Sequence, residues 1–218
     1  MKMFTYWRSL ATYRVRMALA LKGLKPEEHE IALHAGAQLT PEFAAINPMK
    51  AIPVLIEDDG TTLHQSLPII EYLEERYPDP AIMPADAAGR ARVRALAQIT
   101  VADSHPLCVP RVRGDLATRF GATPDQVNAW ARTWLGAGLD AYEQMLARDR
   151  ETGEFCHGNR IGVADICLMS HAAGVRFFEG TIDKHPTVKR IVERCSADPR
   201  IVGAHPMKQP GAPVPKAG

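Results

Sequence analysis

Prolines at positions 78 and 80 mark the strongest break in this 218-residue sequence. Proline cannot continue a helix, because it lacks the amide proton and its ring clashes with the preceding turn. Before the break, short β-prone segments alternate with helical ones, whereas nearly every later segment has helical periodicity. We therefore expect an α/β domain over residues 1–80 and an all-helical domain over 87–205. Recurring prolines predict an extended or disordered tail over 206–218.

The first domain is predicted to be a mixed sheet with helices packed against it. Gly23 follows an apolar pattern of helical spacing and is a common helix stop. Asp58-Asp59-Gly60 is a strong hairpin turn signal between two β-prone segments. The β-prone segments are 2–6, 28–33, 53–56 and 61–63, and the main helical segments are 10–22 and 66–76.

The second domain is predicted from helix start and stop signals. Thr123, Pro124 and Gln126 have the pattern of a capping box with proline in the first turn. Pro106 and Pro110 should interrupt the helix that begins near residue 87. The predicted helices cover 87–103, a segment from 124, 162–178 and 186–195.

The charge balance excludes a general nucleic-acid binder. Lys plus Arg number 26 against 25 for Asp plus Glu, giving +1, whereas such binders carry a large basic excess. No apolar run reaches the roughly 18 residues of a membrane span, and Arg8 interrupts any signal-peptide core. We therefore expect a cytoplasmic protein with no nucleic-acid and no membrane partner.

The cysteines are scattered, without a CxxC pair or a zinc-finger spacing. In a chain without a secretory signal, this pattern predicts ordinary buried thiols in a reducing compartment. We expect no bound metal, and the missing CxxC disfavours a disulfide reductase. The four are Cys108, Cys156, Cys167 and Cys195.

Three short segments have residue types that suit ligand binding. Ser9 stands at a strand-to-helix junction, where helix amides favour an anion, although a simple N-cap has the same residue type. A cis bond at Pro53 would turn the Ile52 backbone toward a ligand, and about 5–6% of such bonds are cis. Gln65 and Ser66 begin the next helix and suit either a carboxylate or, again, a simple cap.

These segments occur together with others in a specific order. They include Arg8-Ser9, residues 13–19, 21–23, Asn47-Pro48-Met49-Lys50, His64-Gln65-Ser66, 69–75, 84–86, 92–96, Ser104-His105-Pro106-Leu107 and Val163-Ala164-Asp165. Together they resemble zeta-class glutathione S-transferases, which include maleylacetoacetate and maleylpyruvate isomerases. The resemblance implies a thioredoxin-like N-terminal α/β domain followed by an all-α C-terminal domain, with glutathione as cofactor and a homodimeric assembly.

The resemblance also implies roles for individual residues. Ser9 would be the catalytic residue, because a hydroxyl beside a helix N-terminus stabilises the glutathione thiolate over the thiol. The other expected glutathione contacts are Gln38 near the glycyl end, Ile52 with cis Pro53 at the cysteinyl unit, and Gln65 with Ser66 at the γ-glutamyl carboxylate. Asp165 would have a structural role as a helix cap.

Arginines would bind the small dicarboxylate substrate, since the guanidinium fork matches both oxygens of a carboxylate. The resemblance assigns this to Arg8, Arg111 and Arg176, with Arg113 as a weaker candidate; solvated surface arginines would look the same in the sequence. The implied reaction is cis-trans isomerisation of maleylacetoacetate or maleylpyruvate, by thiolate addition, bond rotation and elimination.

The chain departs from the family pattern at several positions. Leu10 and Ala11 replace the second serine and the cysteine of Ser-Ser-Cys-Ser, so chemistry that needs that protein thiol is not expected. Cys108 and Val109 replace a Gln-Asn pair, which removes polar side chains. Two alternatives therefore stay open: general conjugation of small electrophiles to glutathione, and a non-catalytic glutathione- or ligand-binding protein.

Overall fold

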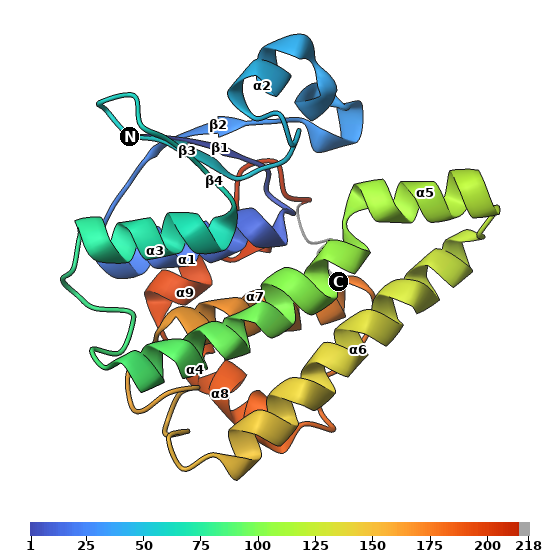
Figure 1. Cartoon of the computed structure of the whole chain (residues 1–218). Coiled ribbons are helices and arrows are strands. Elements are labelled where there is room, and N and C mark those ends of the chain that lie inside the picture. The colour runs from blue at the N-terminus through green and yellow to red at the C-terminus, as the bar shows by residue number, and fades with distance from the viewer. Residues whose placement is uncertain (214–218) are drawn as a thin grey trace. The chain divides into compact units, whose positions relative to one another are not determined.

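The structure, a computed structural model, describes residues 1–213 (Figure 1). The chain forms two compact units, one made of Met1–Ala81 together with the segment from Asp198 onward, the other of Ile82–Ala197. The predicted helical domain extended to residue 205, but its last residues belong to the first unit because they pack on the first helix of the chain.

The first unit is built on a mixed sheet of four strands in the order β2-β1-β3-β4. The central β1 runs parallel to β2 and antiparallel to β3, and β3 pairs with β4 across the predicted turn. The strands are β1 (Lys2–Thr5), β2 (Glu27–Glu30), β3 (Val54–Ile56) and β4 (Thr62–His64). The mixed sheet expected from the sequence is confirmed.

Two long helices cover one face of this sheet. Helix α1 (Leu10–Lys22) and helix α3 (Ser66–Arg76) have the predicted bounds and pack side by side, whereas α2 (Pro41–Ile46) lies on the other face (Figure 1). Buried apolar side chains from the helices and from strands β1 and β3 form the core between them. Lys22 is fully buried and pairs with Glu74, which ties α1 to α3.

The C-terminal segment begins with helix α9 (Pro199–Gly203), which packs on α1. The ring of His205 meets that of Tyr13 edge to face, with centroids 5.6 Å apart. The tail predicted to be extended or disordered from residue 206 instead starts with a 3₁₀ turn at Pro206–Lys208. Its last part, residues 214–218, lies outside the described residues.

The second unit is helical, as predicted. Its helices are α4 (Ala87–Gln98), α5 (Pro110–Phe120), α6 (Pro124–Arg148), α7 (Val163–Phe177) and α8 (Pro186–Ser196). Residues 163–175 of α7 are all buried, so this helix is the core of the unit. No helix in residues 1–213 has the length and apolar character to cross a membrane.

The predicted helix 87–103 changes form after Gln98. Residues Ile99–Ser104 form a π-helical segment and His105–Cys108 a 3₁₀ turn before α5 begins. Ser104 Oγ donates to the Ile99 carbonyl at 2.7 Å, and Thr100 Oγ1 lies 2.8 Å from the Tyr142 hydroxyl in α6. The irregular segment is therefore held by a bond within itself and by a contact with α6.

Candidate functional site

Strand register brings the predicted glutathione contacts to one edge of the sheet. Phe4 is opposite Val54, and Val54 is opposite His64. The chain therefore leaves β1 and β4 at the edge where it enters β3, and the parallel β2 ends there too. Ser9 follows β1, Gln38 follows β2, the pair Ile52–Pro53 precedes β3, and the pair Gln65–Ser66 follows β4. Four segments that are distant in the sequence thus meet at one edge.

Ser9 caps helix α1 with its hydroxyl oxygen. The Thr12 backbone N–H donates to Ser9 Oγ at 3.2 Å. A hydroxyl that accepts in this way still has one proton to donate, and within the described residues this proton has no acceptor. Ser9 therefore presents an oriented O–H donor beside the N-terminal amides of α1, where anions are stabilised.

The approach to β3 contains a cis peptide bond between Ile52 and Pro53. Both residues are buried at the sheet edge. Gln38 lies in the 3₁₀ turn Ala37–Leu39, and its buried Oε1 has no hydrogen-bond partner among the described residues. An unsatisfied buried oxygen is costly unless a ligand or water supplies a donor. Gln38 thus offers an acceptor to a ligand at this edge.

Helix α3 begins without a side-chain cap. Its N-cap residue Gln65 has φ 69°, a left-handed conformation that costs about 1–3 kcal/mol in residues other than glycine. The Gln65 side chain makes no cap bond, and within residues 1–213 the first-turn amides have no side-chain acceptor, so they can serve an anion. The following Ser66 is buried, and its Oγ accepts a 3.0 Å hydrogen bond from Arg14 Nε. No local signal in the sequence indicates this bond, because its two residues are 52 positions apart.

The arginines predicted for the substrate lie in both units. Arg8 is exposed at the start of the first unit, while Arg111 is exposed in the first turn of α5. Arg176 is exposed in the last turn of α7. Hydrogen bonds from Lys189 and Thr181 lower the pKa of Asp183, and the charge of Arg176 makes a smaller contribution in the same direction.

Asp165 makes the contacts of a helix cap in α7. Its two oxygens accept from the backbone N–H groups of Cys156, at 2.8 Å, and Gly162, at 2.9 Å. Burial raises the pKa of this carboxyl, and the two backbone bonds oppose that effect. The residue thus satisfies the N-cap amide of α7 and one amide of the preceding loop.

The cysteine thiols do not offer an activated nucleophile. All four are buried, and none forms a disulfide within the described residues. Burial raises the pKa of the Cys108 thiol to about 11 despite the nearby charge of Arg113. Burial, followed by the nearby Asp165 carboxylate, raises the pKa of Cys156 well above its usual value. Since the thiolate is the reactive form, the raised pKa values make Cys108 and Cys156 poor nucleophiles.

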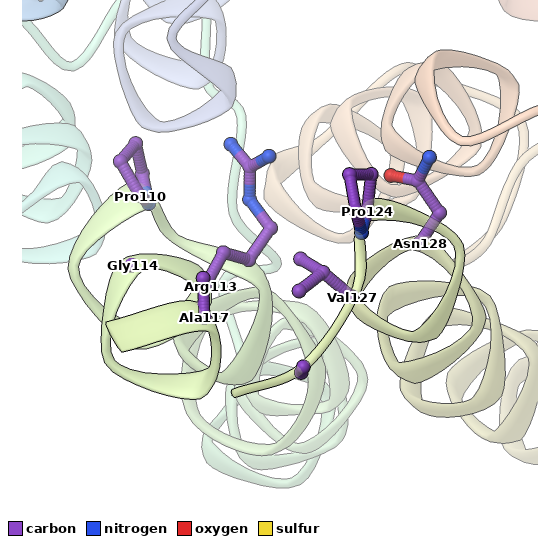
Figure 2. Close-up of a pocket in the computed structure, with 8 residues that line it drawn as sticks. Pro110, Arg113, Gly114, Ala117, Pro124, Val127 and Asn128 are labelled. Atoms are coloured by element: carbon purple, nitrogen blue, oxygen red, sulfur yellow. The ribbon is translucent and has the colours of Figure 1, made fainter. Parts of the chain in front are cut away.

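The helical unit also has an open pocket of about 410 Å³ between α5 and α6. In Figure 2 the Arg113 side chain is seen between Pro110 on one side and Pro124 with Val127 on the other. Arg113 Nε donates to the Cys108 carbonyl at 3.0 Å, and its guanidinium lies 5.2 Å from the Phe178 ring centroid. The pocket is lined by Pro110, Arg113, Gly114, Ala117, Ala122, Pro124, Val127 and Asn128, and so by none of the principal predicted residues.

Family models decide which family this chain belongs to. Residues 8–76 match the glutathione S-transferase N-terminal domain, and residues 117–203 match its C-terminal domain. The chain is also 40% identical to the maleylpyruvate isomerase of Ralstonia sp over 212 residues, covering 96% of this chain and 99% of that protein. This chain belongs to the glutathione S-transferase family.

Other members of the glutathione S-transferase family place it within the zeta class. The maleylacetoacetate isomerase of Pseudomonas aeruginosa is 40% identical over 216 residues, or 98% of this chain and 100% of that protein. A zeta-class maleylpyruvate isomerase structure superposes with a TM-score of 0.94 at 38% identity, covering 98% and 100% of the two chains.

A second solved structure was determined with ligands. The maleylacetoacetate isomerase of Methylobacterium extorquens AM1, with bound malonate and glutathione, has a TM-score of 0.96 at 43% identity. The match covers 98% of this chain and 100% of that one. The zeta-class assignment and the two-domain glutathione S-transferase fold expected from the sequence are confirmed.

Proposed function

We propose that this chain is a glutathione-dependent isomerase that converts a maleyl dicarboxylate, maleylacetoacetate or maleylpyruvate, from cis to trans. The observation that carries the proposal is the Ser9 hydroxyl, which is oriented by the Thr12 N–H and has a proton that no described residue accepts. The names of the relatives support the substrate class, and the malonate bound in one of them is also a dicarboxylate.

The sheet edge of the first unit fits glutathione. Gln38 Oε1 needs a donor, which an amide N–H near the glycyl end of the tripeptide can supply. The uncapped amides of α3 at Gln65 and Ser66 need an acceptor, which the γ-glutamyl carboxylate supplies. We assign the backbone of Ile52, beside the cis bond to Pro53, to the cysteinyl unit.

Ser9 is the residue to which we assign catalysis. Bound glutathione supplies a thiolate that adds reversibly to the double bond of the substrate and so permits rotation about it. The Ser9 O–H donates toward the sulfur, and the N-terminal amides of α1 add a positive potential. Both effects favour the negative form of the sulfur over the neutral thiol, which lowers its pKa.

Arg8, Arg111 and Arg176 are our candidates for the substrate carboxylates. A guanidinium binds both oxygens of a carboxylate and stays charged across the whole working pH range. A cation near the carbonyl end of the substrate also stabilises the negative charge that develops there in the transition state. All three are exposed side chains, and a ligand can therefore reach them.

The departures from the family pattern leave this assignment in place. Leu10 is buried, so its side chain packs into the protein. Cys108 is buried as well, and its Sγ lies 3.7 Å from the Ala131 carbonyl as a weak donor. Neither replacement removes the Ser9 hydroxyl or the free amides of α3.

The proposal is tested by mixing the protein with glutathione and maleylpyruvate or maleylacetoacetate and following the loss of the cis-enol absorbance. Many turnovers with glutathione left unconsumed are expected. Stoichiometric consumption of glutathione would instead identify a conjugating transferase. Glutathione binding without any turnover would identify a binding protein, and either result would overturn the proposal.

The assembly and cellular setting complete the proposal. We assign a homodimer, a cytoplasmic location and a place in aromatic amino acid catabolism; the activity named for one relative, maleylacetoacetate isomerase, supports the last of these. Light scattering at several protein concentrations tests the dimer, and a monomeric mass throughout would contradict it. Neighbouring catabolic genes would distinguish between the two maleyl substrates.

A further inference from the structure

Arg14 is a buried cation bonded to the start of α3, and the proposed mechanism does not use it. Only 2% of its surface is exposed, so it is not placed to bind a ligand directly. Its Nε–H reaches from α1 to the Ser66 hydroxyl at the start of α3, at 3.0 Å. The bond joins residues 52 positions apart and is wholly buried.

The polarity of this bond is fixed. A guanidinium has only donors, so Ser66 Oγ must be the acceptor. One oxygen lone pair is then occupied, and the hydroxyl proton is directed away from Arg14. A charged donor also polarises the hydroxyl, which makes its O–H a stronger donor in turn. Without Arg14 the same hydroxyl could rotate and act as an acceptor, which would repel an anion.

We infer that Arg14 is a positioning residue, which holds the Ser66 hydroxyl as a donor toward the γ-glutamyl carboxylate of glutathione. The inference deepens the proposed function and rests on it. In this role Arg14 acts on the ligand through Ser66. It follows that the effect of Arg14 should depend on the negative charge of that carboxylate and on the presence of the hydroxyl.

Arg16 provides a matched control on the same helix. It is also a buried arginine, 7% exposed, but its guanidinium bonds to Glu28 and Thr5. Arg16→Met should therefore lower the stability of the fold, as Arg14→Met does, without changing how the site discriminates between ligands. A purely structural role for Arg14 would make the two variants alike.

The experiment measures binding of two ligands by calorimetry: glutathione, and glutathione with its γ-glutamyl α-carboxylate converted to the amide. Arg14→Met should weaken glutathione binding about tenfold, the size expected for one charge-assisted hydrogen bond. Binding of the amide should change by less than about twofold. In a Ser66→Ala background, Arg14→Met should add almost nothing, because the hydroxyl it positions is gone.

Arg14→Lys keeps the buried charge but replaces Nε with a methylene. This variant allows the test to be made even if Arg14→Met does not fold. A loss of about fivefold is expected for glutathione and again little for the amide. Equal losses for both ligands, or an Arg14 effect that persists in Ser66→Ala, would overturn the inference. If the unaltered protein bound neither ligand, the proposed function itself would fail.

Discussion

The start of helix α3 differs from the starts of helices α7 and α8. The first turn of α3 has no side-chain cap, and its N-cap residue Gln65 has a strained left-handed backbone. At the start of α7, by contrast, Asp165 folds back and accepts from the N–H of Gly162 and of Cys156. Glu143 does the same for α8, accepting from the N–H groups of Thr187 and Val188.

The difference separates stability from function. Side-chain carboxylates in the helical unit satisfy backbone amides and so stabilise the fold. At the proposed glutathione edge, the first-turn amides of α3 and the Ser9 hydroxyl proton are left for a ligand, and α3 forgoes the stabilisation of a side-chain cap. Substitutions in the two regions should therefore have separable effects: on unfolding for Asp165 and Glu143, on ligand chemistry for Ser9.

The largest effect is expected on stability, for Asp165→Ala. The change leaves two largely buried N–H groups unsatisfied and should cost about 3 kcal/mol of unfolding free energy. Urea unfolding measures it, and Asp165→Asn, which keeps one acceptor oxygen, should lose about half as much. Glutathione affinity of the folded fraction should be unchanged. A loss of affinity with unchanged stability would break the distinction between the two regions.

The next largest effect is expected on catalysis, for Ser9→Ala. Turnover should fall about 100-fold, as for the loss of one donor to a developing anion, while stability falls by about 1 kcal/mol through the lost cap. The matched control is Thr123→Ala, which removes a similar N-cap hydroxyl from α6. Its stability should fall by a comparable amount, and its turnover should stay normal. Similar turnover in Ser9→Ala and Thr123→Ala would contradict the catalytic role assigned to Ser9.

A smaller and more selective effect is expected for Arg176→Ala. Turnover of the maleyl dicarboxylate should fall about tenfold, whereas conjugation of a neutral electrophile should fall less than about twofold, since only the dicarboxylate needs the cation. Steady-state kinetics on the two substrates gives the ratio, and Arg190→Ala at an exposed position of α8 serves as control. Equal losses of turnover on the two substrates would show that Arg176 does not bind the substrate carboxylates.

The smallest effect concerns pH and Glu143. Partial burial raises its pKa, but the bonds from Val188 and Thr187 outweigh this and leave the pKa below the usual value. A depressed native-state pKa means stability that is present above the unfolded pKa, about 4.5, and is lost as the pH falls through the native value. Glu143→Gln should cost about 0.5–1 kcal/mol at neutral pH and less in acid. If the difference in unfolding free energy between Glu143→Gln and the unaltered protein stayed constant across pH, titration of Glu143 would not be the cause.

Local signals were sufficient for much of the fold. Helix α1 begins after Ser9 and ends before Gly23, as predicted. The cap hydroxyl and the left-handed glycine each act on amides or carbonyls within one turn of the chain, so both signals are local. The hairpin turn at Asp58–Gly60 and the capping box of Thr123 with Gln126 formed for the same reason. Each of these elements depends on neighbours within a few positions in the sequence.

Long-range contacts could not be predicted in this way. The sequence could not pair Arg14 with Ser66, because the two residues are 52 positions apart. The π-helical turn Ile99–Ser104 and the capping of α8 by Glu143 likewise depend on packing between distant elements. At the site, the residue types were predictable but the direction of each donor was not.

The central claim is that the start of α1, with the Ser9 hydroxyl, holds the glutathione sulfur as a thiolate. The most direct test is a titration of the ultraviolet thiolate absorbance of glutathione bound to the unaltered protein and to Ser9→Ala. The pKa of the bound thiol should lie well below that of free glutathione and should rise toward it in Ser9→Ala. An unshifted pKa in the unaltered protein, or the same depressed pKa in both, would contradict the claim.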